Sequence, residues 1–388
     1  MNDVNLSQIV SHLSEKIGIR FGGTENELST AYYIRDTLKS LSLDSNIEFY
    51  NFLGWEINGE PNLQIKKPIK KNIECNSFVY SMKTPADGVE GFIRKAGKMK
   101  IVDLFEWDKY IIEDVNKIPK AYIVSSSDDF PHSIPILDPT ILMPQVVVSK
   151  NSSELFDKFL DVGENVLCSL LIDCKFKDDA ISQNVVTEIE GRNNEKMMIV
   201  GGHYDTAYNS PGAWDNGTGT AGMFKIIEYF KNNKPPFTLR FVFFGCEEYL
   251  FLGSKAYIKN LIDKNELDKV FFMINFDATP PAKKFANNVG KQLIQVYEKE
   301  YKVKEMLTNS MKKVNLDKTF KIDFTSPPLP NSDQWPFYKE EIPCIKFSEP
   351  GGSYDFYHTP NDTIDKLDFD IVNQATNFII DFIKNFEI

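Results

Sequence analysis

Side chains that can bind metal ions or move protons are concentrated in four short segments of the chain. The segments are His203-Tyr204-Asp205 with Asp215 following, Glu247-Glu248, Asp277 and Tyr357-His358. They supply one imidazole and one carboxylate for each of two metal ions, one carboxylate that both ions can share, and one further glutamate. Such a set is typical of metal-dependent hydrolysis, in which two ions activate a water molecule and a separate base moves its proton. Only four histidines occur in the chain, and two of them lie in these segments.

Apolar stretches directly precede three of these segments. MMIVGG comes before His203, RFVFFGC before Glu247, and MINF before Asp277. Nearly continuous apolar runs are typical of strands that are buried on both faces, and in open α/β sheets ligands bind at the carboxyl ends of such strands. We therefore expect the three segments to meet at one edge of a sheet, although they are far apart in the sequence.

The adjacent acids Glu247 and Glu248 need a compensating cation. They follow a buried strand, where unpaired charges are costly, and no lysine or arginine occurs within FFGCEEYLF. Two divalent ions that share one carboxylate would compensate them. Imidazole nitrogen and carboxylate oxygen suit zinc, with cobalt or manganese as possible substitutes. Asp205 is expected to accept the proton of the second ring nitrogen of His203, and the alternative is an aspartate that caps a turn.

The elements that must position these segments alternate along the chain. Strands are expected at NVVTEIEG, KMMIVGGHYD, TLRFVFFGCEE, VFFMINFD, FKIDFT and PCIKFSE, and helices at about 219–232, 254–263, 283–301 and 367–385. This alternation predicts an α/β fold with a mostly parallel, mixed sheet between layers of helices. Two helices are expected before residue 50, and short β-like runs predict an inserted β-rich subdomain over 51–166.

The composition narrows the class of protein. The hydrophobic fraction of 42% is sufficient for a packed core, and the net charge of -11 argues against nucleic acid or an anionic membrane as a partner. The five scattered cysteines are interpreted as reduced thiols, with a disulfide as the alternative. No secretory signal and no run of roughly 18 apolar residues is visible, so the cytoplasm is favoured and secretion is the alternative. The sequence does not fix the oligomeric state.

Several motifs together carry a family resemblance. NVVTEIEG, HYDT, PGAWDNGTGTAGM, FVFFGCEEYLFLGS, INFD and YHTPNDT resemble the co-catalytic dinuclear zinc aminopeptidases, a family that also includes glutamate carboxypeptidase and glutaminyl cyclase. The resemblance extends over residues 184–388 and implies a zinc-exopeptidase-like catalytic domain formed by 1–50 and 167–388. Residues 51–166 resemble the protease-associated domain of some members, although no comparably specific motif marks them.

The resemblance assigns a role to each residue of the site. It makes His203 and Asp277 ligands of one zinc ion, Glu248 and His358 ligands of the other, and Asp215 the bridge between them. Glu247 becomes the general base. Tyr357 matches a tyrosine that binds the oxyanion in some relatives, and the alternative is a packed aromatic residue. A cis peptide is expected between Asp215 and Asn216. At NSDQWPF this chain has Gln334 where many relatives have histidine, which puts substrate positioning in question.

Four functions are compatible with this inventory. The favoured one is an aminopeptidase that removes N-terminal residues from peptides. Glutaminyl cyclase is the nearest alternative, and a carboxypeptidase for acidic C-termini is another, which should show arginines near the site to hold a carboxylate. A receptor or scaffold that binds peptides without catalysis is the last, and it is disfavoured because every ligand position and the base are intact.

Overall fold

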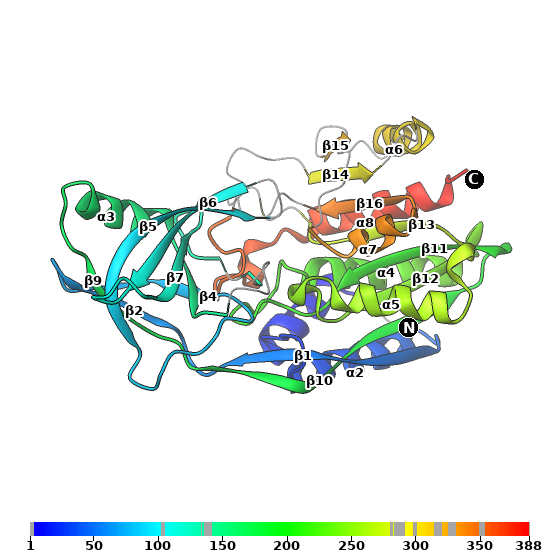
Figure 1. Cartoon of the computed structure of the whole chain (residues 1–388). Coiled ribbons are helices and arrows are strands. Elements are labelled where there is room, and N and C mark those ends of the chain that lie inside the picture. Colours follow the sequence, from blue (N-terminus) through cyan, green and yellow to red (C-terminus); the bar gives the residue numbers. More distant parts are fainter. Residues whose placement is uncertain are drawn as a thin grey trace. The chain divides into compact units, whose positions relative to one another are not determined.

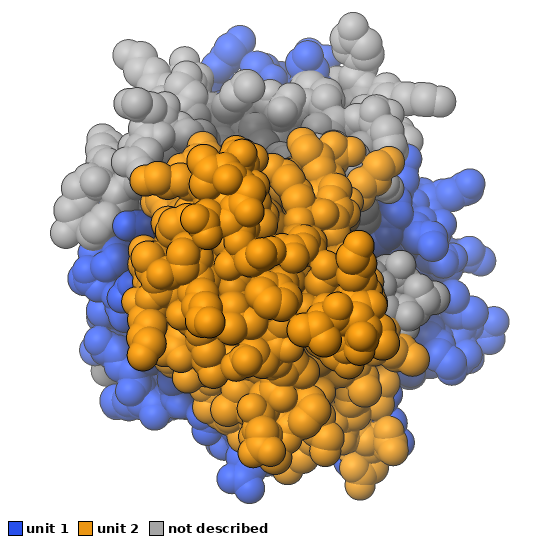
Figure 2. Space-filling model, turned by 60° about the vertical axis from the view of Figure 1, so that its left-hand side comes forward, with its two compact units in different colours: residues 1–52, 181–388 blue, residues 53–180 orange. Residues whose placement is uncertain are grey.

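The protein folds into two compact units. The computed structural model describes residues 4–101, 105–132, 134–135, 142–279, 282, 292–297, 301–313, 320–324, 331–348 and 354–387. One unit consists of residues 1–52 and 181–388, and the other of residues 53–180 (Figure 2). The second unit extends to residue 180, beyond the expected residue 166. It includes β9 (Leu167–Leu171), which pairs with other strands of that unit.

The first unit is built on an eight-stranded sheet with the order β1-β10-β12-β11-β13-β16-β14-β15 (Figure 1). The strands are β1 (Ser45–Ile57), β10 (Cys174–Ile189), β11 (Asn193–His203), β12 (Phe237–Phe244), β13 (Val270–Phe276), β14 (Gln292–Tyr297), β15 (Phe320–Phe324) and β16 (Cys344–Ser348). β12, β11, β13 and β16 run parallel, whereas β10 is antiparallel to β12 and β14 is antiparallel to β16. The sheet is therefore mixed, with a parallel centre.

Helices cover both faces of this sheet, and the alternating side chains of β11 show it. Met198 and Val200 pack in an apolar core with residues of α1 (Leu6–Ser11), α2 (Glu25–Ser40), α4 (Gly217–Asn232) and α8 (Phe369–Lys384). Met197 and Ile199 pack in a second core with residues of α5 (Leu252–Asp263) and α7 (Gln334–Lys339). Successive side chains of a strand point to opposite faces, so the two cores lie on opposite sides of the sheet.

Small residues let α4 approach the end of β13. A Cβ atom added at Gly219 would collide with the carbonyl oxygen of Phe276, and one added at Gly222 would collide with the ring of the same phenylalanine. The small residues of DNGTGTAGM therefore permit close packing of α4 against the sheet. It matters for the site because Asp215 lies just before α4 and Asp277 just after β13.

One predicted element is wrong. A helix was expected over 283–301, but residues 292–297 form strand β14, which pairs with β15 and β16. Residues 283–291 lie outside the described part of the chain. The next helix, α6, begins only at Tyr301 and ends at Lys313. The run QLIQVY is compatible with either element when it is read alone, and its pairing with two neighbouring strands decides the conformation.

The second unit contains another eight-stranded sheet, with the order β3-β2-β9-β5-β6-β7-β8-β4. Besides β9, its strands are β2 (Asn62–Lys67), β3 (Lys71–Ile73), β4 (Cys75–Ser77), β5 (Val89–Ile101), β6 (Phe105–Glu113), β7 (Pro119–Ser125) and β8 (Gln145–Val148). This β-rich character agrees with the short apolar runs of the sequence. The helix α3 (Lys150–Leu160), which Ser149 caps through its side chain, was not expected.

The described residues also address two compositional predictions. All five cysteines are free and buried, as expected of reduced thiols. Within the described part of the chain, no helix has the length and apolar character needed to cross a membrane. The cytoplasmic location stays a prediction.

Candidate active site

Three neighbouring strands bring the predicted segments to one edge of the sheet. β11 ends at His203, which pairs in register with Phe244 at the end of β12. Glu247 and Glu248 follow β12 after a two-residue turn, and Asp277 directly follows β13. β11 lies between β12 and β13 and is parallel to both. The strand ends therefore converge as the sequence predicted.

The converging side chains form two clusters that share Asp215. In the first cluster, Nε2 of His203 lies 3.1 Å from Oδ1 of Asp215 and 3.4 Å from Oδ1 of Asp277. In the second, Nε2 of His358 lies 3.3 Å from Oδ2 of Asp215 and 3.1 Å from Oε1 of Glu248. Asp215 thus offers one oxygen to each cluster, which is the arrangement expected of a carboxylate that bridges two ions.

The donor atoms fit two zinc ions. Oδ1 of Asp215 and Oε1 of Glu248 are buried and make no hydrogen bond, which is costly unless a cation binds them. Burial alone would lower the pKa of the two imidazoles, but nearby carboxylates, Glu247 for His203 and Glu248 for His358, raise it well above the ordinary value. The carboxylates therefore stabilise positive charge at the imidazole nitrogens. Zinc ions bound by nitrogen and oxygen donors would supply that charge.

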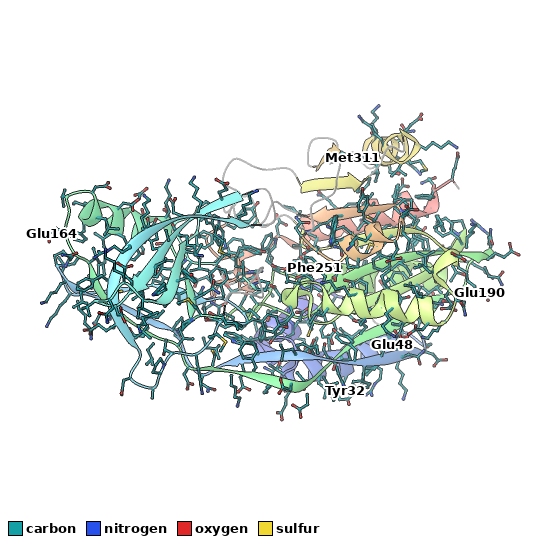
Figure 3. The ribbon with its side chains drawn as sticks, viewed as in Figure 1. Tyr32, Glu48, Glu164, Glu190, Phe251 and Met311 are labelled. Atoms are coloured by element: carbon teal, nitrogen blue, oxygen red, sulfur yellow. The ribbon has the colours of Figure 1, made fainter. Side chains whose placement is uncertain are left out.

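Glu247 lies beside the clusters in a buried position. It forms a group with His203 and Glu248, and its exposed fraction is 8%. Burial raises the pKa of Glu247 well above its ordinary value, His203 opposes the shift, and Glu248 adds to it. A carboxylate with a raised pKa is a stronger proton acceptor than an exposed one, as a general base near neutral pH requires. The backbone carbonyl of Glu247 also accepts a hydrogen bond from the backbone nitrogen of Phe251 (2.8 Å). Phe251 lies at the start of α5 (Figure 3).

Asp205 contacts both the imidazole and the glutamate pair. Nδ1 of His203 lies 3.2 Å from the backbone oxygen of Asp205 and 3.5 Å from its Oδ1. The two carboxylate oxygens accept hydrogen bonds from the backbone nitrogens of Glu247 (3.0 Å) and Glu248 (3.2 Å). Asp205 is fully buried. Its carboxylate therefore orients the turn that carries the glutamates, and its role in orienting His203 stays a prediction.

Asn216 ties the bridging aspartate to the third strand. The peptide bond between Asp215 and Asn216 is cis, as predicted. The side chain of Asn216 donates a hydrogen bond to the carbonyl oxygen of Phe276 (2.8 Å) and accepts one from the backbone nitrogen of Ala278 (2.9 Å). It thus holds both residues that flank Asp277.

Two further residues singled out by the sequence, Tyr357 and Gln334, lie in buried but different surroundings. The ring of Tyr357 stacks on His358 with centroids 3.8 Å apart, and burial with the carboxylates of Asp215 and Glu248 raises its pKa well above the ordinary value. The phenol therefore keeps its proton and can donate a hydrogen bond, and oxyanion binding stays a prediction. Gln334 is buried and accepts a hydrogen bond from Nδ2 of Asn275 (2.8 Å), so it braces β13 from within the protein.

The family model for peptidase family M28 matches residues 184–383, which are more than half of the chain. The chain belongs to peptidase family M28. Aminopeptidase YwaD of Bacillus subtilis is 24% identical over 400 residues, which cover 95% of this chain and 82% of that protein. A solved zinc aminopeptidase from Bacillus subtilis has a TM-score of 0.72 at 22% identity and covers 98% of this chain and 95% of its own.

A second solved structure confirms the M28 fold. It is a peptidase M28 precursor from Shewanella amazonensis, with a TM-score of 0.79 at 19% identity. The match covers 98% of this chain and 92% of that chain. The α/β fold and the resemblance to the co-catalytic zinc peptidases are thus confirmed. The likeness of the second unit to a protease-associated domain stays a prediction.

Two charged residues that brace the site of this M28 peptidase were missed by the sequence. Arg20, which is fully buried, donates hydrogen bonds to the carbonyl oxygens of Tyr204 (2.9 Å), Pro211 (2.7 Å) and Gly212 (3.0 Å). Asp362 accepts hydrogen bonds from the backbone nitrogens of Trp214 (2.7 Å) and Asp215 (3.0 Å). Together they hold the loop that leads from the first ligand to the bridging aspartate. Asp362 lies in YHTPNDT and could have been noticed there, whereas no signal marked Arg20.

A buried glutamate outside the metal clusters should make stability depend on pH. Glu27 of α2 accepts hydrogen bonds from Oγ of Ser182 (2.6 Å) and the backbone nitrogen of Gly23 (2.6 Å). Burial, with Asp205 adding to the effect, raises the pKa of Glu27 from 4.5 to about 8. The folded protein thus binds a proton that the unfolded chain releases, so this contribution to stability is lost as the pH rises from about 4.5 to about 8.

Replacing Glu27 by glutamine should flatten this dependence, because the amide stays neutral at every pH. We expect the decrease of the unfolding free energy between pH 6 and 8 to be smaller in E27Q than in the parent by up to about 1.4 kcal/mol per pH unit. Urea denaturation of the metal-stripped proteins measures it. The control is E25Q, which changes an exposed glutamate of the same helix. Parallel profiles for E27Q and the parent would contradict the prediction.

Proposed function

We propose that the chain is a zinc aminopeptidase in which Glu247 is the general base. The observation that carries the proposal is the shared carboxylate of Asp215, whose two oxygens face His203 and His358 separately. Two clusters joined in this way suit a pair of metal ions about 3.5–4 Å apart. Glu247 stands beside them without being needed as a ligand. The aminopeptidase relatives support the substrate class, since peptides with a free N-terminus are the substrates that their names imply.

The residues of the chain divide the reaction among them. When bound, the zinc ions would polarise the scissile carbonyl and make a water molecule between them more acidic. His203 with Asp277 would hold one ion, Glu248 with His358 the other, and Asp215 both. Glu247 would take a proton from the water and deliver it to the leaving amine. Tyr357 would donate its phenolic hydrogen bond to the oxyanion.

The alternatives need features that the described residues do not favour. A carboxypeptidase for acidic C-termini would use arginine to hold the terminal carboxylate. Arg20 is bonded to backbone carbonyls, and Arg240 pairs with Glu188 (2.8 Å) and Glu266 (2.7 Å). Neither guanidinium is available as a clamp. A binding protein without catalysis would not need Glu247 next to two complete ligand clusters.

One assay separates the enzymatic alternatives. The purified chain, loaded with zinc, should release the first residue from aminoacyl arylamides and from a peptide that begins with glutamine, and it should leave the N-acetylated forms intact. A cyclase would instead convert the glutaminyl peptide into a pyroglutamyl peptide and ammonia. Mass spectrometry of the products distinguishes the two. Cyclised product, or cleavage from the C-terminus, would overturn the proposal, and a panel of aminoacyl arylamides would define the preferred residue.

A further inference from the structure

A buried lysine occupies one side of the Asp277 carboxylate. Lys346 lies on β16, where it pairs in register with Asn275 of the parallel strand β13. Its Nζ lies 2.7 Å from Oδ2 of Asp277, whereas Oδ1 of the same carboxylate lies 3.4 Å from Nε2 of His203. The exposed fraction of Lys346 is 4%. The two oxygens of Asp277 therefore face different partners, one the ammonium group and the other the metal cluster.

The charge of this lysine is accounted for by Asp277. A buried ammonium group is costly unless a carboxylate pairs with it, and the neighbours of Lys346 along the strand, Ile345 and Phe347, are apolar. The Nζ of Lys346 lies 2.7 Å from Oδ2 of Asp277, so this oxygen is the one that pairs with the ammonium group.

Within the described part of the chain, the second cluster has no counterpart of Lys346. Glu248, which takes the place of Asp277 there, lies 3.1 Å from His358 through Oε1. That oxygen is buried and makes no hydrogen bond. Among the described residues no lysine or arginine forms an ion pair with Glu248. The two terminal carboxylates are thus chemically unequal, because only one of them shares an oxygen with an ammonium group.

We propose that Lys346 is a positioning residue that withholds Oδ2 of Asp277 from the metal, so that Asp277 binds through Oδ1 alone. The inference rests on the proposed two-zinc function. A carboxylate can bind zinc through one or two oxygens, and a catalytic zinc must keep a position open for water or substrate. By occupying Oδ2, Lys346 keeps that position open at the ion held by His203 and Asp277. Its positive charge also weakens the hold of the carboxylate on the ion.

Replacing Lys346 should slow the release of zinc, whereas a substitution that only loosens the site would speed it. In K346M, Oδ2 is released and the nearby positive charge is gone, so Asp277 can bind the ion with both oxygens. We expect K346M to keep two zinc ions per chain, to release zinc to a chelator about 10-fold more slowly, and to lose about 10- to 100-fold in kcat. A lysine that merely supported the fold would do the opposite, because its loss would loosen the site and release zinc faster.

Three measurements on the full-length chain test this. Zinc content and the rate of zinc transfer to a chromogenic chelator report how tightly the ions are held. The visible absorption of the cobalt-substituted protein reports coordination independently of activity, and it should weaken in K346M because absorption falls as the coordination number rises. K346Q, whose amide can still donate a hydrogen bond to Oδ2 without the charge, should be intermediate in the rate of zinc release, in cobalt absorption and in kcat.

The control is K313M, which removes a lysine that pairs with Asp381 (2.8 Å) away from the site. It should match the parent in zinc release and kcat. Faster zinc release or unchanged zinc release in both Lys346 variants would overturn the inference while leaving the proposed function intact. If K346M fails to fold, K346Q decides by the same criteria. A parent protein that binds no zinc would overturn the proposed function, and the inference with it.

Discussion

Replacing Glu247 by glutamine is expected to abolish turnover while both zinc ions stay bound. The amide has nearly the shape of the carboxylate but cannot accept a proton from water. A positioned general base contributes about 10²- to 10⁴-fold to the rate, so kcat should fall by at least that factor. The backbone of Glu247 keeps its hydrogen bond to Asp205 in the variant, and the turn should keep its conformation. Zinc content and kcat for an aminoacyl arylamide are the measurements.

The neighbouring glutamate provides the matched control for that experiment. E248Q makes the same chemical change one residue further on, but it removes a charged ligand that lies 3.1 Å from Nε2 of His358. We expect E248Q to bind zinc less tightly at the second cluster, in contrast to E247Q. Equal zinc loss in the two variants, or substantial activity in E247Q, would show that the base has been assigned to the wrong residue.

Replacing Asp215 by asparagine is expected to remove metal binding from both clusters at once. Its two oxygens lie 3.1 Å from His203 and 3.3 Å from His358, and the amide leaves only one oxygen, without charge. No other single ligand contacts both imidazoles among the described residues. The variant should lose zinc on dialysis and retain less than about 10⁻³ of the parent activity, which reflects the loss of both ions.

Zinc analysis after dialysis and the thermal midpoint test this prediction. D263N, which changes an exposed aspartate that pairs with Lys259, is the control and should behave as the parent. The chelator-stripped parent provides the reference for a metal-free but folded protein. If D215N kept two zinc ions, Asp215 would not be the bridge.

The sequence predicted part of the candidate site from local signals, and the family resemblance supplied Asp215 and His358. An apolar strand ends directly before His203 and Asp277, and the position of a strand end is a property of a few neighbouring residues. The strand at 292–297 had no such local signal, since a short apolar run is compatible with a helix until its neighbours are known. Its pairing with β16 depends on residues that are distant in the sequence.

The supporting charges could not be predicted for a related reason. Arg20 donates hydrogen bonds to carbonyl oxygens nearly two hundred positions away in the sequence. Every residue has a backbone carbonyl, so residue types do not indicate which carbonyls an arginine will bind. Lys346 did carry a weak signal, because it is the single charge in the apolar run PCIKF. A lone lysine in a buried strand predicts a buried acid, but it does not say which one.

The contacts of Arg20 have a consequence for what counts as the catalytic segment. The stretch 184–383 that matches the family contains every proposed ligand and the base. Yet the loop before Asp215 is held by a guanidinium from residue 20, and the turn before Glu247 adjoins Glu27 through Cys246. A fragment that began at residue 184 would inherit the chemistry without its scaffold. The segment before the second unit therefore supports the active site through Arg20 and Glu27, although it contributes no proposed ligand.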